Sequence, residues 1–315
     1  MRKILSMLGS FLWKAQGSSL PRCTLAIVIC FFVQFALVMC CAAAELKQKT
    51  IEAFEHYVRV CDARMEADLR VSGHFLWLDS LPEPGRDQLY DQLRSGQLEI
   101  REERTQEGKA IKVPGGLIHD WVGVVFVPGA SIQQAVSFLQ DYDNHCRTYQ
   151  PGVRRSKMLD HTDDNFEIYL QFYKESPRRV SFNTVFEVHY SQIDATHVIS
   201  SAISTRVAEL QNPEQPDSPE LAVGQGHGYI WRLNNYWRVE ERDGGVYTEV
   251  ETIALSRDVP AIFAWFVNPL IRRVSQESLA MLLSATRQGL LAKPKELGPG
   301  DIPPARRSAP ASPCD

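Results

Sequence analysis

The sequence lacks the short motifs by which common enzyme classes are recognised. It contains no Gly-x-Ser-x-Gly, no phosphate loop, no dinucleotide fingerprint and no His-Glu-x-x-His. Each absence removes support for one class: α/β-hydrolases, P-loop nucleotide hydrolases, dinucleotide-dependent oxidoreductases and zinc peptidases. We therefore predict no catalytic residue, no metal ligand and no cofactor. An enzyme is not excluded, but we favour a protein that binds without catalysis.

Cysteine is scarce once the first 44 residues are set aside. Four of the seven cysteines lie there, which leaves Cys61, Cys146 and Cys314. No Cys-x-x-Cys pair remains, so a zinc ribbon or a thioredoxin site has no support. Three cysteines do not make a disulfide framework, although an exported compartment would permit a bond between Cys61 and Cys146.

Basic tracts are missing as well. The chain has 34 Lys and Arg against 38 Asp and Glu, and the first 44 positions hold four of the basic residues and none of the acidic ones. The rest of the chain is therefore acidic by about eight charges. Nucleic-acid-binding proteins are usually basic, so we expect no nucleic acid partner.

Residues 1–44 are typical of a signal peptide or an N-terminal membrane anchor. Basic residues precede an apolar run from Leu25 to Ala44, which is broken only by Gln34 and ends in three small residues. This order is that of an export signal, and the run is also long enough to span a bilayer through residues 25–44. In either case the rest of the chain is predicted to be exported, either to the periplasm or to the outer side of the cytoplasmic membrane.

Residues 45–118 are predicted to form a helical segment and a small hairpin. Apolar residues spaced by three or four positions between Glu45 and Arg70 indicate an amphipathic helix. A short helix is expected over 86–94, and a hairpin between 98–104 and 110–113. The sequence leaves open whether this segment packs on the following domain or forms a stalk.

From residue 119 the pattern is that of an α+β domain ending near residue 291. A strand over 121–127 and a helix over 131–140 precede strand-like runs over 153–159, 166–174, 180–190 and 197–210. The strands 228–242 and 246–255 flank the turn Asp243-Gly244-Gly245. A long helix then starts at Pro260 and is expected to break or kink near Asn268, before Pro269. Residues 292–315 are expected to be a disordered tail.

The last hairpin has two faces of opposite character. One face is apolar and must be covered, by the long helix among other elements. The other carries Arg232, Arg238, Glu240, Glu249 and Glu251 and is expected to be solvated. The residues expected to line a ligand site between hairpin and helix are Trp231, Leu233, Trp237, Val239, Val250, Phe263, Phe266 and Leu270.

The order strand, two helices, about six antiparallel strands and a long helix resembles the helix-grip fold of the START-like (SRPBCC) superfamily, which includes polyketide cyclases. Residues 119–291 carry the resemblance, through Trp121–Val127, Asp141–Asp143, Tyr149–Ser156, Trp231–Arg238 and Ala285–Arg287. The sequence also resembles exported bacterial members of unassigned activity. The resemblance implies a curved antiparallel sheet wrapped around the long helix, with a tunnel for an apolar ligand between them.

Three functions remain open at this point. The first is a non-catalytic carrier or sensor of a lipid or another hydrophobic small molecule in the cell envelope. The second is a cyclase- or hydrolase-type enzyme that uses the same tunnel through His145 or through Glu249 and Glu251. The third is a membrane-tethered interaction module that docks through residues 45–118. If the charged face were buried, Tyr236 and Tyr247 would join the two glutamates in a polar site.

Overall fold

The computed structural model describes residues 45–103, 111–260, 264–292 and 314. Among these residues no helix is both long and apolar enough to cross a membrane. The predicted signal or anchor, 1–44, lies outside the described residues. So does the predicted tail, apart from Ala292 and Cys314.

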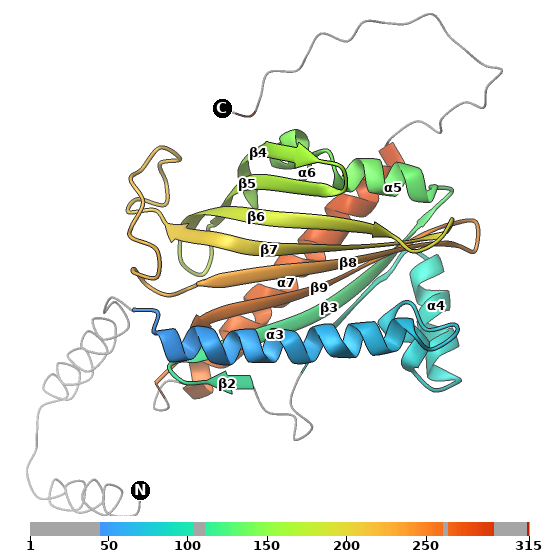
Figure 1. The fold of residues 1–315 in the computed structure, drawn as a ribbon, viewed down its shortest axis with the longest axis horizontal. Helices are drawn as coiled ribbons and strands as arrows, with labels where there is room; N and C mark the ends of the chain where they lie inside the picture. Colours follow the sequence, from blue (N-terminus) through green and yellow to red (C-terminus); the bar gives the residue numbers. More distant parts are fainter. Residues whose placement is uncertain (1–44, 104–110, 261–263, 293–313, 315) are drawn as a thin grey trace, which may run out of the picture. The chain divides into compact units, whose positions relative to one another are not determined.

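A nine-stranded antiparallel sheet forms the centre of the molecule (Figure 1). Its order is β1-β3-β9-β8-β7-β6-β5-β4, and β2 also pairs with β3. The strands are β1 (Leu98–Glu102), β2 (Ile111–Val113), β3 (Gly116–Pro128), β4 (Val153–Thr162), β5 (Asn165–Lys174), β6 (Val180–Gln192), β7 (His197–Glu209), β8 (Arg232–Arg242) and β9 (Gly245–Arg257).

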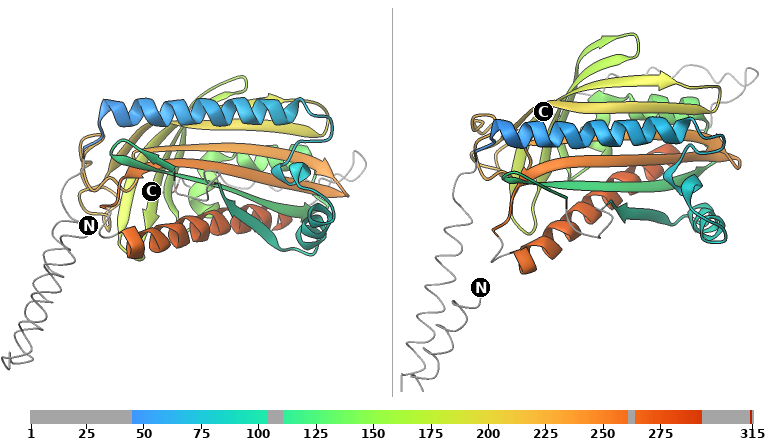
Figure 2. Two further views of the ribbon diagram at one scale, coloured as in Figure 1. Left: turned by 90° about the horizontal axis from the view of Figure 1, so that it is seen from below. Right: turned by 60° about the horizontal axis from the view of Figure 1, so that its bottom comes forward.

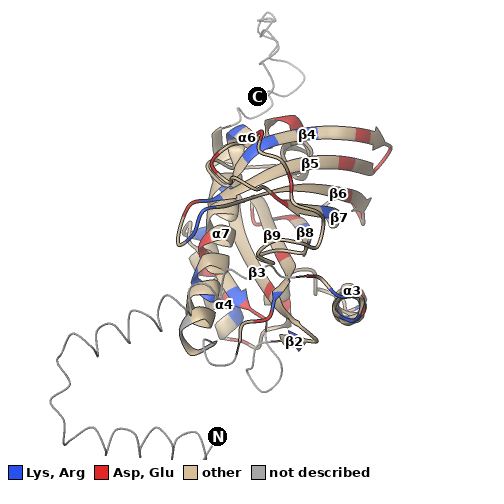
Figure 3. Cartoon of the chain, turned by 90° about the vertical axis from the view of Figure 1, so that its left-hand side faces the viewer, with Lys and Arg blue, Asp and Glu red and all other residues tan. Residues whose placement is uncertain are grey.

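The helices include one long helix on each face of the sheet. The elements are α3 (Gln48–Leu69), η2 (Trp77–Ser80), α4 (Gly85–Arg94), α5 (Ile132–Leu139), η3 (Tyr142–Asn144), α6 (His145–Thr148) and α7 (Ala264–Ala292). The sheet separates α3 from α7 in views from two directions (Figures 2 and 3). This is the α+β helix-grip arrangement predicted from the sequence, with a second long helix added on the other face.

Strand β3 carries apolar side chains on both of its faces, so a helix can pack on each face of the sheet. Its side chains alternate between the two sides: Ile118 packs with α3 residues, whereas Trp121 and Val125 pack with α7 residues. Both sets are buried, so the strand is an almost continuous apolar run rather than an alternating one. Strands covered on both faces have this composition.

The turn predicted at Asp243-Gly244-Gly245 is confirmed, the helix predicted over 131–140 begins after a cap at Ser131, and one hairpin prediction is wrong. Ser131 caps α5 by accepting a hydrogen bond from the Gln134 backbone N–H. Asp243 and Gly244 both adopt positive φ in the two-residue turn between β8 and β9. The hairpin predicted between 98–104 and 110–113 does not form. Strands β1 and β2 instead pair with different parts of β3, because this 13-residue strand is long enough for both.

The break that was one of the two outcomes predicted near Asn268 does not occur in α7. The helix is continuous from Ala264 to Ala292 with Pro269 inside it. Proline removes one backbone hydrogen bond and its ring crowds the carbonyl four residues earlier, but Pro269 is near enough to the start of the helix for both effects to fall on the first turns.

The bond between Cys61 and Cys146, which the sequence left open, does not form. Cys146 is bonded to Cys314, with 6.3 Å between the Cα atoms, and Cys61 is a buried free thiol. Cys61 lies on α3 and Cys146 on α6, beside β4 at the other end of the sheet order, so they cannot meet. Cys314 packs instead against the apolar cluster around Cys146.

Candidate functional site

The face of the sheet that carries α7 is apolar, as the hairpin pattern predicted. Trp121 and Val125 of β3, with Val250 of β9, pack against Leu279 and Leu283 of α7. The adjoining larger cluster is built from α5, α6 and strands β4 to β9, and includes Val239 and Val246. Alternation along β8 and β9 places these side chains on one side, and α7 covers them.

A glycine lets α7 approach the sheet. A Cβ atom on Gly123 would lie 2.7 Å from Cδ1 of Leu283 and 3.2 Å from Cδ2 of Leu279. These separations are shorter than ordinary carbon–carbon contacts, so a side chain at this position would force Leu283 and Leu279 to shift.

The contact between α7 and the sheet is uneven along the helix. Leu279, Leu283, Thr286 and Leu290 are buried, whereas none of the described side chains from 265 to 278 is fully buried. On the sheet side, Phe172, Leu233 and Trp237 pack against the core clusters but remain half-buried, as does Leu282 of α7. These four side chains form a partly accessible apolar surface between α7 and the sheet, called the hydrophobic surface below.

The predicted ligand-binding residues fall into four groups. Val239 and Val250 are sealed in the core, whereas Leu233 and Trp237 belong to the hydrophobic surface. Leu270 is 43% exposed. Phe263 lies outside the described residues, and so does the side chain of Phe266.

Trp231 is misplaced by the sequence prediction. It packs on the opposite face, among Phe54 and Cys61 of α3 and Leu255 of β9. The prediction assumed that alternation extended back from Leu233, but β8 begins at Arg232. Trp231 precedes the regular strand, so the alternation does not determine where its side chain points.

The charged face of the hairpin is buried, not solvated as predicted. Arg238, Glu249 and Glu251 are at most 6% exposed, beneath residues of the 45–103 segment. Acidic positions can be seen along the central strands in Figure 3. A guanidinium nitrogen of Arg238 lies 3.2 Å from Glu249, and the Trp77 backbone N–H donates to the same carboxylate at 2.8 Å. Burial raises the pKa of Glu249 to about 7, against the opposing effect of Arg238.

A second buried polar cluster joins α3 to the sheet. Asp120 of β3 accepts hydrogen bonds at Oδ2 from the Tyr57 hydroxyl at 2.7 Å and from the Cys61 thiol at 3.8 Å. Arg64 of α3 forms an ion pair with Glu251 of β9. Burial and the neighbouring Glu251 raise the pKa of Asp120 to about 8, and burial also raises that of Glu251. This cluster could not be predicted from sequence patterns, because its members are far apart along the chain.

The other polar candidates are not brought together with the hydrophobic surface. Tyr236 and Tyr247 lie on the α3 side with the glutamates. His145 of α6 is buried between Tyr142 and Tyr149, and its Nε2 pairs with the Leu139 carbonyl. His119 bonds to the Ser256 hydroxyl at 2.8 Å. A separate polar cavity of about 300 Å³ lies between Asp79, Tyr90, Arg94 and Arg242, where sequence analysis had predicted no site.

The chain resembles solved structures of lipid-transfer proteins and of aromatase/cyclases. A STAR-related lipid transfer protein from Xanthomonas axonopodis is 22% identical and covers 57% of this chain and 96% of its own, with a TM-score of 0.37. A Zhui aromatase/cyclase from Streptomyces is 9% identical, with coverages of 55% and 93% and a TM-score of 0.37. A START superfamily protein from Mycobacterium smegmatis is 12% identical, with coverages of 54% and 96% and a TM-score of 0.36.

No protein-family model and no curated protein matches the sequence. Of the three solved structures, the Mycobacterium smegmatis protein is described as a member of the START superfamily. At these identities and TM-scores, the function has to be argued from the residues of this chain.

Proposed function

We propose that the chain binds a lipid or another hydrophobic small molecule between the sheet and the N-terminal half of α7. The supporting observation is that Phe172, Leu233 and Trp237 are half-buried beside a sealed core. Binding sites for such ligands are mostly apolar with few polar groups. The ligand is carried or sensed rather than transformed.

The exposure of α7 supports the same location. Leu270 is 43% exposed, and none of the other described side chains between 265 and 278 is sealed against the sheet. Covering apolar surface stabilises a complex by roughly 25 cal/mol for each Å² removed from water. A hydrophobic ligand placed here would gain contacts from both the helix and the strands.

The alternatives have less support. Glu249 and Glu251, the carboxylates of the enzyme hypothesis, point to the α3 side of β9, away from this surface. The interaction-module hypothesis requires a large exposed apolar patch on residues 45–118. In the described part of that segment, the apolar face of α3 instead packs on the chain's own sheet through Phe54, Cys61 and Met65.

We also propose that residues 1–44 export the chain to the cell envelope. The basic and apolar pattern of this segment supports this proposal. The intact mass of the protein isolated from its source cells tests it. A mass equal to that of a chain starting at Glu45 indicates a cleaved signal. A full-length mass in the membrane fraction indicates that residues 1–44 are retained as an anchor. Full-length protein in the cytosol would contradict export.

The binding proposal is tested by native mass spectrometry of the gently purified chain, followed by extraction and identification of what it carries. We expect a reproducible mass increase from a lipid or similar molecule. A clean unliganded mass, together with no binding when phospholipids and fatty acids are titrated in, would refute the proposal.

A matched pair of variants locates the site. Leu270→Asp places a charge on the partly accessible part of α7, and we expect the bound molecule to be lost or its affinity to fall at least tenfold. Val60→Asp places the same charge on an exposed position of α3 and should leave binding unchanged. If both variants bound the ligand equally well, the ligand site would not lie at the N-terminal half of α7.

A further inference from the structure

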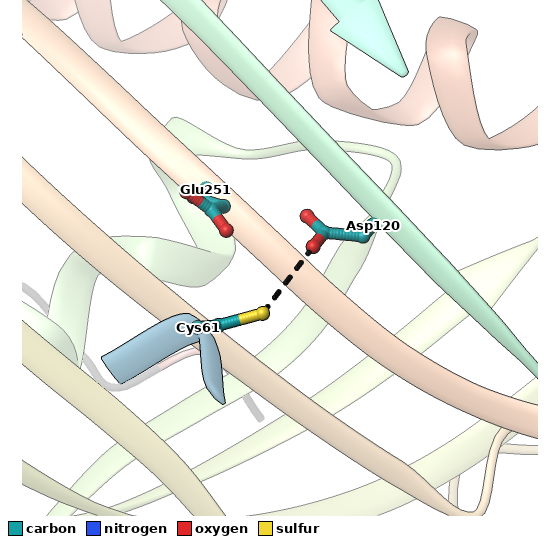
Figure 4. Close-up of side chains that lie close together, drawn as sticks. All are labelled: Cys61, Asp120 and Glu251. Carbon is teal, nitrogen blue, oxygen red and sulfur yellow. Dashed lines mark hydrogen bonds between the residues drawn. The ribbon is translucent and has the colours of Figure 1, made fainter. Parts of the chain in front are cut away.

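Three potential metal-binding side chains meet where α3 crosses the sheet. Cys61 of α3, Asp120 of β3 and Glu251 of β9 each offer one atom, and these atoms lie within 4.8 Å of one another. The side chains point toward each other in Figure 4. Because they come from three elements, a single ion held by all three would join the N-terminal helix to the sheet.

Asp120 has an unmet bonding requirement at this point. The residue is 1% exposed, and its Oδ1 has no hydrogen-bond partner among the described residues. Its Oδ2 already accepts from Tyr57 and Cys61. A buried carboxylate oxygen without a partner is costly, and in native structures it indicates a proton or an ion that supplies the missing contact.

The charges around Asp120 do not balance. Three carboxylates, those of Asp120, Glu249 and Glu251, face two guanidinium groups, Arg64 and Arg238. The nearby Glu103 is already paired with Arg101. Among the described residues, neither Arg64 nor Arg238 nor any other basic side chain forms an ion pair with Asp120 itself. With all three carboxylates ionised, one negative charge is left over, which either a bound proton or a bound cation has to neutralise.

A divalent cation would correct this imbalance. The ion adds two positive charges, and the Cys61 thiol releases its proton to solvent as the sulfur–metal bond forms, which adds one negative charge. The cluster is then neutral. A thiolate with two carboxylates suits Zn²⁺ or a similar transition metal and not Mg²⁺ or Ca²⁺, which take oxygen ligands alone.

We propose that Cys61, Asp120 and Glu251 bind one divalent transition-metal ion of the zinc class, which fastens α3 to the sheet. The 3.8 Å between Cys61 Sγ and Asp120 Oδ2 is close to the roughly 3.5 Å between sulfur and oxygen ligands of a tetrahedral zinc ion, so little movement is needed. The side chain of Arg64, which pairs with Glu251, is 40% exposed, whereas that of Glu251 is 8% exposed. The site is separate from the hydrophobic surface, on the other face of the sheet.

Cobalt serves as the probe. The full chain is stripped with a chelator and titrated with Co²⁺, which gives a thiolate charge-transfer band in the near ultraviolet when it binds sulfur. We expect one equivalent to bind, Zn²⁺ to displace it, and Zn²⁺ to raise the melting temperature. Cys61→Ser should abolish the charge-transfer band. Tyr57→Phe, which removes a hydrogen bond to a ligand, should weaken binding by about 10- to 100-fold.

Two further variants keep the test decisive. Glu66→Gln, on an exposed position of α3, should bind Co²⁺ like the unchanged chain. Asp120→Asn removes the uncompensated charge, so the metal-free variant should melt at a higher temperature while binding no metal. If the folded, unchanged chain shows no thiolate band and no zinc-induced rise in melting temperature, a proton on the carboxyl pair neutralises the cluster and the metal proposal is wrong.

Discussion

Single residues set how closely α7 fits the sheet, and Gly123 is the clearest case. Gly123→Ala would place a methyl group 2.7 Å from Leu283 Cδ1. We expect it to lower the free energy of unfolding by about 1–3 kcal/mol, the usual cost of overpacking. Urea unfolding measures the change. Gly85→Ala, where a Cβ atom meets nothing within 4 Å, should have no such cost. A Gly123→Ala protein as stable as its parent would contradict the packing described.

His145 gives the fold a dependence on pH. Burial lowers its pKa to about 4, from an ordinary value of 6.5. Between these values the unfolded chain binds the proton and the folded chain does not. The contribution of His145 to stability is therefore full above pH 6.5 and is lost toward pH 4, by at most about 1.4 kcal/mol per pH unit.

Unfolding by urea at a series of pH values measures this dependence. His145→Gln should flatten the stability profile in that window, because the titrating group is gone. His161→Gln, at an exposed position, should keep the profile of the unchanged chain. Identical profiles for all three proteins would show that His145 does not titrate as described.

At the scale of whole elements, α3 is held mainly by its apolar face. Phe54 is 3% exposed and packs near Ile253 and Leu255 of β9. Phe54→Ala should cost about 3–5 kcal/mol through lost burial and the cavity left behind. Val60→Ala, on the exposed side of the same helix, should change stability by less than about 0.5 kcal/mol.

Amide hydrogen exchange would show which elements are destabilised in Phe54→Ala. In Phe54→Ala, the amides of α3 should lose protection first, because their helix has lost its anchor on the sheet. Uniform loss of protection across β4 to β6 as well would indicate that α3 and the sheet unfold only together.

Element order and side-chain alternation could be predicted from the sequence, because both depend on local patterns. The two faces of β8 and β9 were separated correctly, as shown by Leu233 and Trp237 on one side and Arg238 on the other. What covers the charged face could not be predicted. An amphipathic helix shows that it packs on something, but not on which surface. The pairing of Cys146 with Cys314 and the meeting of Cys61 with Asp120 depend on the same long-range geometry.

At the scale of the whole molecule, one covalent bond closes a large part of the chain. The Cys146–Cys314 disulfide joins residues 168 positions apart. Closing so long a loop restricts the unfolded chain, so Cys314→Ser should lower the free energy of unfolding by about 2–5 kcal/mol. A reductant should destabilise the unchanged chain by a similar amount and leave the variant unaffected. Equal sensitivity to the reductant would mean that the bond does not form.

Strand β9 contributes side chains both to the apolar packing on the α7 side of the sheet and to the acidic cluster on the α3 side. Val250 points to the α7 side and Glu251, the next residue, to the α3 side. Neighbouring residues on one strand cannot move independently, so any displacement of β9 by a guest on one side changes the surroundings of the carboxylate on the other. A nuclear magnetic resonance signal from the buried acidic cluster would thus report on events across the sheet, without any label at the hydrophobic surface.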